Sequence, residues 1–252
     1  MIDILQINLK KAAEILKQSK HITAFTGAGI SVESGIPPFR GKNGLWSKYD
    51  PKILELNYFF QHPKDSWEII KEIFYDFFGQ AEPNAAHLTL AEMEKNNLLQ
   101  AVITQNIDNL HQKAGSKNVF EFHGTSNKML CTNCKRKFES DRVHLDKLPP
   151  KCIACGGLLK PDFIFFGEGI PPVAYQKSIE EAENADVFLL IGTTGLIEPA
   201  ASIPYKAKYN GAVIIEVNPE RTVFTEKITD IFLQGKATEI MKQLRELIIE
   251  DE

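Results

Sequence analysis

The sequence predicts an α/β fold, in which a doubly wound parallel sheet is joined to a second, smaller domain. Short apolar runs recur along the chain and alternate with helical patterns, which is typical of a parallel sheet covered by helices on both faces. A glycine-rich turn follows the first of these runs directly. Four cysteines lie as two close pairs in a stretch with few large apolar residues, so we expect a small stapled module there.

The individual elements follow from hydrophobic periodicity. Apolar residues at positions 5, 9, 12 and 16 predict an amphipathic first helix. Short apolar runs predict strands at 22–26, 101–104, 163–166, 187–191 and 213–217. Helical patterns separate most of them, at 85–95, 172–184 and 200–208.

Two stretches interrupt this alternation. Residues 39–83 are dense in aromatic side chains and helical in pattern, so we expect an inserted helical module with its own small core. Residues 126–160 carry all four cysteines and form the second insertion. The sheet domain is then predicted from 1–38, 84–125 and 161–252, with the active site in the cleft between it and the insertions.

The composition excludes several classes of protein. With 43% hydrophobic and 25% charged residues, the chain has enough apolar material for a core and is not a disordered tail. A net charge of -4 gives no electrostatic reason to expect direct nucleic-acid binding. Since no apolar run approaches the roughly 18 residues of a membrane span and the N-terminus lacks signal-peptide features, we expect a cytoplasmic protein without a membrane partner.

The cysteine spacing predicts one structural zinc ion. Cys131 and Cys134 are separated by two residues, as are Cys152 and Cys155, and such pairs present four thiolates to one metal. Four thiolates leave no open position for water, so the metal would stabilise the fold. The alternatives are redox or unliganded thiols, or a nucleic-acid-binding ribbon, because three basic residues at 135–137 adjoin the first pair.

A candidate phosphate-binding turn follows the first predicted strand. In the run from Gly27 through Ala28 and Gly29 to Ser31, glycines allow close approach of a pyrophosphate to the backbone, as in Rossmann-like folds. The dehydrogenase fingerprint requires a third glycine or alanine where this chain has Val32. A turn that binds no ligand is the alternative.

Further motifs follow in a fixed order along the chain. They are GAGISVESGIPPFRG from residue 27, TQNID at 104–108, FHG at 122–124, FGE at 166–168, GTT at 192–194, NPE at 218–220 and GKA at 235–237. In this order they resemble the sirtuin family, the NAD-dependent protein deacylases, of bacterial or archaeal type. The resemblance covers nearly the whole chain.

The resemblance implies a reaction between NAD and an acyl-lysine protein or peptide, in which nicotinamide leaves and the acyl group moves to ADP-ribose. His123 matches the catalytic histidine, and an imidazole suits a base that takes a ribose proton. Asn106 is implied in catalysis and, with Asp108, in positioning nicotinamide and ribose. A loop-capping structural role is the alternative for His123, and simple helix packing is the alternative for His111.

The resemblance also implies a cofactor site. Phe39 and Arg40 match a mobile loop whose aromatic ring would cover the reacting ribose, although a purely structural Phe39 is the alternative. The cofactor-binding residues implied by analogy are Gly27, Ala28, Gly29, Ser31, Phe39, Arg40, Gln105, Asn106, Asp108, Gly192, Thr193, Asn218, Glu220 and Ala237.

For the substrate, the resemblance implies a peptide added as a strand between 165–169 and 195–198. The implied substrate-binding residues are Ile107, Phe165, Phe166, Gly167, Glu168, Leu196 and Ile197. Of these, Ile107, Phe165 and Ile197 would form an apolar tunnel for the lysine, and ordinary core packing is the alternative for each.

The chain departs from the family pattern in places. Pro38 stands where most members have an acidic or small residue. The sequence at 195–199 is closer to that of the branch that contains desuccinylases. That branch recognises acidic acyl groups with a tyrosine and an arginine, near whose places this chain has Ile70 and Ile73. A buried carboxylate would lack a bidentate partner there, so acetyl or longer neutral acyl groups are expected over succinyl.

Two alternative functions stay open at this point. A protein mono-ADP-ribosyltransferase would use the same activated ribose. A non-catalytic NAD-binding zinc-ribbon scaffold would bind the cofactor without turnover, although His123 and Asn106 argue against it. A hydride-transferring dehydrogenase is disfavoured by Val32.

Overall fold

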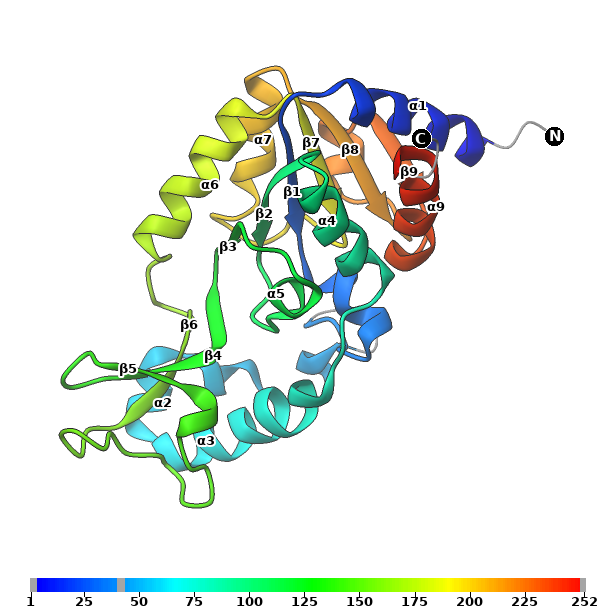
Figure 1. The fold of residues 1–252 in the computed structure, drawn as a ribbon. Helices are drawn as coiled ribbons and strands as arrows, with labels where there is room; N and C mark the ends of the chain where they lie inside the picture. The colour runs from blue at the N-terminus through cyan, green and yellow to red at the C-terminus, as the bar shows by residue number, and fades with distance from the viewer. Residues whose placement is uncertain (1–3, 40–43, 250–252) are drawn as a thin grey trace.

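The computed structural model describes residues 4–39 and 44–249. They form a large lobe around a parallel sheet and a smaller lobe built from helices and an antiparallel sheet (Figure 1). The two lobes confirm the predicted α/β class with a smaller second part.

The large sheet has six strands in the order β3-β2-β1-β7-β8-β9. Their bounds are β1 Ile22–Thr26, β2 Leu99–Thr104, β3 Val119–Glu121, β7 Val187–Ile191, β8 Val213–Asn218 and β9 Ile231–Gln234. All neighbouring pairs are parallel, so the six carboxyl ends share one edge. The chain leaves β1 towards β2 and returns on its other side at β7, which makes the β1–β7 boundary the topological switch point where such sheets bind ligands.

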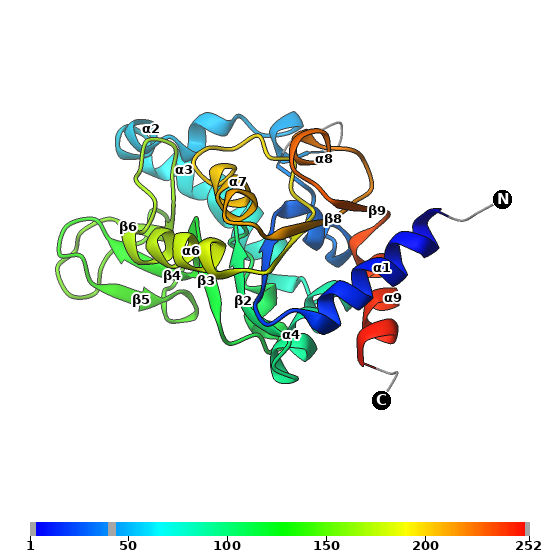
Figure 2. The same cartoon turned by 90° about the horizontal axis from the view of Figure 1, so that it is seen from above.

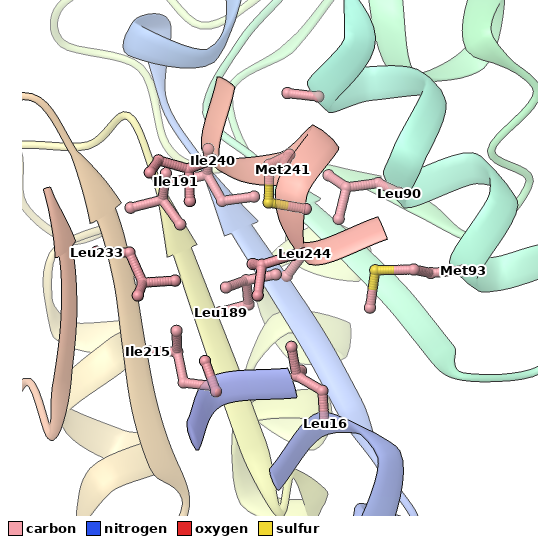
Figure 3. Packing of buried hydrophobic residues seen from close by; sticks show 14 of the residues in the cluster. Leu16, Leu90, Met93, Leu189, Ile191, Ile215, Leu233, Ile240, Met241 and Leu244 are labelled. Atoms are coloured by element: carbon pink, nitrogen blue, oxygen red, sulfur yellow. The ribbon is translucent and has the colours of Figure 1, made fainter. Parts of the chain in front are cut away.

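Helices cover both faces of this sheet. On one face lie α1 (Ile4–Gln18), α4 (Ala85–Lys95) and α9 (Ala237–Ile249), and Figure 2 shows the two terminal helices lying together. Figure 3 shows side chains of α4 and α9 packed over the strands. The opposite face is covered by α6 (Pro172–Asn184) and α7 (Ser202–Tyr209).

Shorter elements make up the connections and the smaller lobe. They are η1 Ala28–Ser34, η2 Leu45–Ser47, η3 Pro51–Leu54, α2 Leu56–Gln61, α3 Pro63–Ile70, the π-helical turn η4 Lys71–Phe77, η5 Phe78–Gln80, α5 Leu110–Ala114, β4 Gly124–Cys131, β5 Lys137–Glu139, η6 Ser140–Arg142, β6 Leu159–Phe163 and α8 Val223–Lys227. The strands β5-β4-β6 form an antiparallel sheet next to α2 and α3.

The helical insertion and the cysteine-bearing insertion share one apolar core, which differs from the expectation of a separate helical core. Trp67 from α3, Phe74 from η4 and the buried thiols Cys131 and Cys152 all belong to one cluster. The Trp67 indole N–H also donates to the carbonyl oxygen of Leu159 at 2.8 Å. Because the two insertions contribute to one core, each stabilises the other.

One predicted strand is wrong. The apolar run 163–166 was expected in the parallel sheet, but only Phe163 is in a strand, at the end of β6 in the small antiparallel sheet. The run is apolar because Phe163 and Phe165 are buried in the core of the smaller lobe. The strands β3 and β9 and the helix α9 were not predicted, whereas the helices at 85–95 and 172–184 are confirmed.

In the described part of the chain, no helix combines the length and apolar character needed to cross a bilayer.

Candidate active site

Two glycine loops meet at the switch point of the sheet. The Gly29 N–H donates to the carbonyl oxygen of Gly192 at 2.8 Å, which joins the turn after β1 to the turn after β7. A Cβ on Gly29 would lie 2.6 Å from the Cα of Gly192. A Cβ on Gly192, whose φ is +63°, would lie 2.3 Å from the Ile30 nitrogen. The two turns therefore fit together only with glycine at these positions.

The substitution Gly192→Ala is expected to lower the free energy of unfolding by more than about 2 kcal/mol, because it combines left-handed backbone strain with a backbone clash. Urea unfolding measures this. Gly211→Ala isolates the strain, since its φ is +98° and no heavy atom lies within 4 Å of the added Cβ; about 1 kcal/mol is expected. Gly169→Ala has neither problem and should be near neutral. Equal midpoints for the three variants would contradict this packing.

A hydrogen-bonded cluster of three predicted site residues lies beside the glycines. The Asn106 side-chain amide donates to the Gly27 carbonyl oxygen at 3.2 Å and to Ser31 Oγ at 3.1 Å. The Ser31 hydroxyl donates to Asp108 Oδ2 at 2.7 Å. Burial raises the pKa of Asp108, and hydrogen bonds from the Leu110 N–H and from Ser31 oppose that shift. The structure thus brings these three side chains together at the carboxyl edge of β1 and β2.

Two buried histidines support this cluster, and one of them was not predicted. His87 Nε2 lies 3.4 Å from Ser31 Oγ, and its ring centroid lies 4.9 Å from that of His111. His111 Nε2 lies 2.9 Å from Thr26 Oγ1 at the end of β1. Burial lowers the pKa of His87 to about 4 and that of His111 well below its usual value, so both rings are neutral at pH 7. Its contact with Ser31 is seen only in the folded chain, because 56 residues separate the two, although the spacing from Asn84 to His87 marks it locally as part of the cap of α4.

His123 is held in one tautomer by the backbone. Its Nδ1 lies 3.0 Å from the Gln105 carbonyl oxygen, and because a carbonyl can only accept, Nδ1 carries the hydrogen. Nε2 therefore keeps its lone pair. Burial lowers the pKa of His123, while the bond to Gln105 opposes the shift, so the ring is neutral at pH 7. The rings of Phe122 and His123 pack edge to face, with 5.5 Å between their centroids.

Further predicted cofactor-binding residues join the ends of β2, β7 and β8. The Gln105 side-chain amide donates to Thr193 Oγ1 at 3.0 Å, and that of Asn218 donates to the Thr193 carbonyl oxygen at 2.8 Å. Ala237 is buried at the start of α9, whereas Glu220 is exposed beyond β8. Ala28, the next residue after Gly27, is partly exposed at the start of η1.

Phe39 lies on the smaller lobe. Its ring packs against Trp46 at 5.5 Å and Phe74 at 6.5 Å between centroids. Its carbonyl oxygen accepts a hydrogen bond from the Trp46 N–H at 3.0 Å, and that of Pro38 accepts from the Leu45 N–H at 2.9 Å. Arg40 lies outside the described residues.

The predicted substrate residues differ in exposure. Phe165 is 1% exposed and packs between Phe59 and Phe163, so its ring belongs to the core. Phe166 is 48% exposed and lines a surface hollow of about 300 Å³ with Gly167. The remaining members are buried Ile107, partly exposed Glu168 and Ile197, and exposed Leu196.

The four cysteines form a site that fits one zinc ion. Their sulfur atoms all lie within 4.8 Å of one another. The Cys131 and Cys155 sulfurs are 3.5 Å apart, and those of Cys134 and Cys152 are 3.8 Å apart. A tetrahedron with zinc–sulfur bonds of about 2.3 Å has edges of about 3.8 Å, so the spacing and the thiol donors match structural zinc. The structure confirms the predicted grouping of the four side chains.

The comparisons agree with this geometry. The model of the Sir2 family matches residues 27–199. An NAD-dependent protein deacylase of Pyrococcus furiosus is 46% identical over 95% of this chain and 98% of its own length. NAD-dependent protein deacylase 1 of Archaeoglobus fulgidus is 42% identical over 93% of this chain and 96% of its own.

Solved structures of Sir2 proteins are also similar to this chain. A Sir2 homologue in complex with NAD superimposes with a TM-score of 0.88 at 41% identity and covers 96% of this chain and 94% of its own. A Sir2 complex with a p53 peptide and NAD superimposes with a TM-score of 0.87 at 34% identity, over 94% of this chain and 97% of its own.

Proposed function

The chain belongs to the Sir2 family and is an NAD-dependent protein deacylase of the sirtuin type, and from this premise we propose that it transfers neutral acyl groups from acyl-lysine to ADP-ribose. The observation that carries the proposal is a neutral imidazole, on His123, whose Nε2 keeps its lone pair. His123 follows β3, and the cluster around Asn106 and Asp108 follows β2, which is the strand next to β3 in the sheet.

NAD supplies a glycosidic bond whose cleavage releases nicotinamide and opens the ribose carbon to attack by the acyl oxygen. The protein's part is to bind and orient. We assign Asn106 and Asp108 to the nicotinamide and its ribose, because Ser31 and the Gly27 carbonyl hold both side chains at the switch point. The glycine turn is assigned to the pyrophosphate, which needs a close approach to the backbone. Thr193, Asn218, Glu220 and Ala237 are assigned to the adenosine half.

His123 is assigned as the general base. The Gln105 carbonyl fixes the hydrogen on Nδ1, so Nε2 is the atom that accepts a proton from a ribose hydroxyl. Because burial lowers its pKa, His123 is already unprotonated at neutral pH and needs no prior deprotonation.

Phe39 is assigned to shielding the reacting ribose from water, with Arg40 as its predicted neighbour in the cofactor loop. The peptide is assigned to the space between 165–169 and 195–198 as an added strand. We assign the tunnel to Phe166 with Ile107 and Ile197, in place of Phe165, because the Phe165 ring is buried in the core. The division of the chain into a sheet domain and insertions at 39–83 and 126–160 stays a prediction. The position of the active site between the sheet domain and the insertions is part of that prediction.

The preference for a neutral acyl group is argued from α3 and η4. Ile70 and Ile73 are at most 1% exposed and pack in the apolar cluster that contains Ile107. The segment 63–77 contains no arginine, and its Lys71 ammonium is paired with Asp76 at 2.6 Å. A succinyl carboxylate placed against these residues would be buried without a partner.

We therefore expect kcat/KM for an acetyl-lysine peptide, and for one with a longer neutral chain, to exceed that for the matched succinyl peptide about tenfold or more. Steady-state kinetics with one peptide sequence and three acyl groups measure this. A higher value for succinyl would contradict the preference while leaving the deacylase reaction intact.

Labelled NAD separates the proposed reaction from its nearest alternative. Label recovered in acyl-ADP-ribose, with loss of the acyl group from the peptide, supports acyl transfer. Label retained on protein would show mono-ADP-ribosyl transfer instead. Binding of NAD with no release of nicotinamide in the presence of an acyl peptide would indicate a scaffold.

A further inference from the structure

The segment after β6 forms a tight turn between two parts of the proposed site. The Glu168 N–H donates to the Phe165 carbonyl oxygen at 2.9 Å, and Gly167 at the third position has a φ of +94°, as a type II turn requires. Before the turn, the Ile164 N–H donates to the His123 carbonyl oxygen at 2.8 Å. At its corner, the Phe166 N–H and carbonyl oxygen pair with the backbone around Glu55.

A buried lysine binds this segment from inside. Lys160 on β6 is 4% exposed, and its ammonium donates to the carbonyl oxygens of Pro161 at 2.9 Å and Phe163 at 2.7 Å. Its third contact is the carboxylate of Glu168, with Oε2 at 2.9 Å. An ammonium has three N–H donors, so all three are used on a single short stretch of chain.

The Glu168 carboxylate also makes more than one contact. Glu168 Oε2 also accepts a hydrogen bond from the Phe165 N–H at 2.8 Å, across the turn. The Lys160 ammonium lies 4.1 Å from the centroid of the Phe165 ring, which adds a cation–π contact. Burial lowers the pKa of Lys160, and the Glu168 charge opposes that shift. A buried lysine is retained at a cost in desolvation, and its contacts here all fix the conformation of residues 161–168.

We propose that Lys160 and Glu168 form a positioning pair that fixes the turn at 165–168 in the conformation that receives the acyl-lysine peptide. The inference rests on the proposed function, because it requires this segment to bind the substrate backbone. The pair acts on the peptide side of the site. Within the described residues, the side-chain hydrogen bonds and ion pair of Lys160 and Glu168 all lie inside 160–168, apart from the glycine turns and from Asn106 and Asp108.

The test compares steady-state constants of Lys160→Met, which keeps the length of the side chain and removes the charge, with wild type. We expect KM for an acetyl-lysine peptide to rise about tenfold or more, with kcat and KM for NAD within about threefold. Lys160→Arg keeps the charge and should recover part of the loss. Lys177→Met removes an exposed ion pair with Glu180 and should change neither constant.

Two further measurements keep the proposal falsifiable. In a double-mutant cycle, Lys160→Met combined with Glu168→Gln should cost no more than the worse single change, because both act through one contact. If Lys160→Met does not fold, Glu168→Gln alone should raise the peptide KM and speed deuterium exchange across 163–168 in the free enzyme. Additive single changes, or a folded Lys160→Met with an unchanged peptide KM, would overturn the inference. A wild-type protein without peptide-dependent turnover would instead overturn the proposed function.

Discussion

The variant His123→Ala is expected to lose about 10²- to 10⁴-fold in kcat/KM for the acyl peptide, because it removes the group assigned to take a proton from the ribose hydroxyl. Zinc content and unfolding midpoint should stay close to wild type, since the side chain is only partly buried and its ring hydrogen bond goes to the Gln105 carbonyl oxygen. His62→Ala is the matched control, because His62 is an exposed histidine of the smaller lobe.

The pH dependence of kcat/KM gives a second test of the role of His123. Burial lowers the pKa of His123 in the folded protein below its usual 6.5, so the active neutral form persists to lower pH than it would for an exposed histidine. The acid limb of kcat/KM, which reports the free enzyme, should therefore lie below pH 6.5. An acid limb centred above 6.5, or a His123→Ala variant with wild-type activity, would contradict the assignment.

Removal of zinc is expected to have the largest effect on stability. Structural zinc contributes about 10–16 kcal/mol of apparent binding free energy in small zinc modules, and here Cys131 and Cys152 belong to the core that also contains Trp67. A chelator, or Cys152→Ser, should therefore loosen the helical insertion as well as the cysteine module. The chain has two tryptophans, Trp46 and Trp67, both on the helical side, so intrinsic fluorescence reports this coupling.

A neighbouring substitution controls for local disturbance. Ile153→Ser changes the residue next to Cys152, but its side chain is 89% exposed and it supplies no metal ligand. Zinc content, tryptophan emission and unfolding midpoint should all stay at wild-type values. Loss of zinc with unchanged tryptophan emission would contradict the shared core of the two insertions.

Much of the fold could be predicted because periodicity is a local property. The apolar spacing of 85–95 and 172–184 places the helices α4 and α6 at the residues where they occur. The same reasoning fails at 163–166, since buried aromatic residues at a strand end followed by a turn have the same pattern as a buried strand. Apolar residues of α9 at 240, 241, 244 and 248 carry a helical signal that was overlooked.

The site could be predicted only in part, for the same reason. Motifs marked Ser31, Asn106 and Asp108, and the structure brings them within hydrogen-bonding distance. The contact of His87 with Ser31 and that of Lys160 with Glu168 depend on the folded chain, although His87 also caps the start of α4 three residues after Asn84.

The most direct test of the central claim is the stoichiometry of nicotinamide release from NAD by wild-type protein, with an acetyl-lysine peptide and without one. We expect release that depends on the peptide, with one nicotinamide and one acyl-ADP-ribose formed for each lysine uncovered. Release that is independent of the peptide, or a peptide that keeps its acyl group while NAD is consumed, would contradict the account.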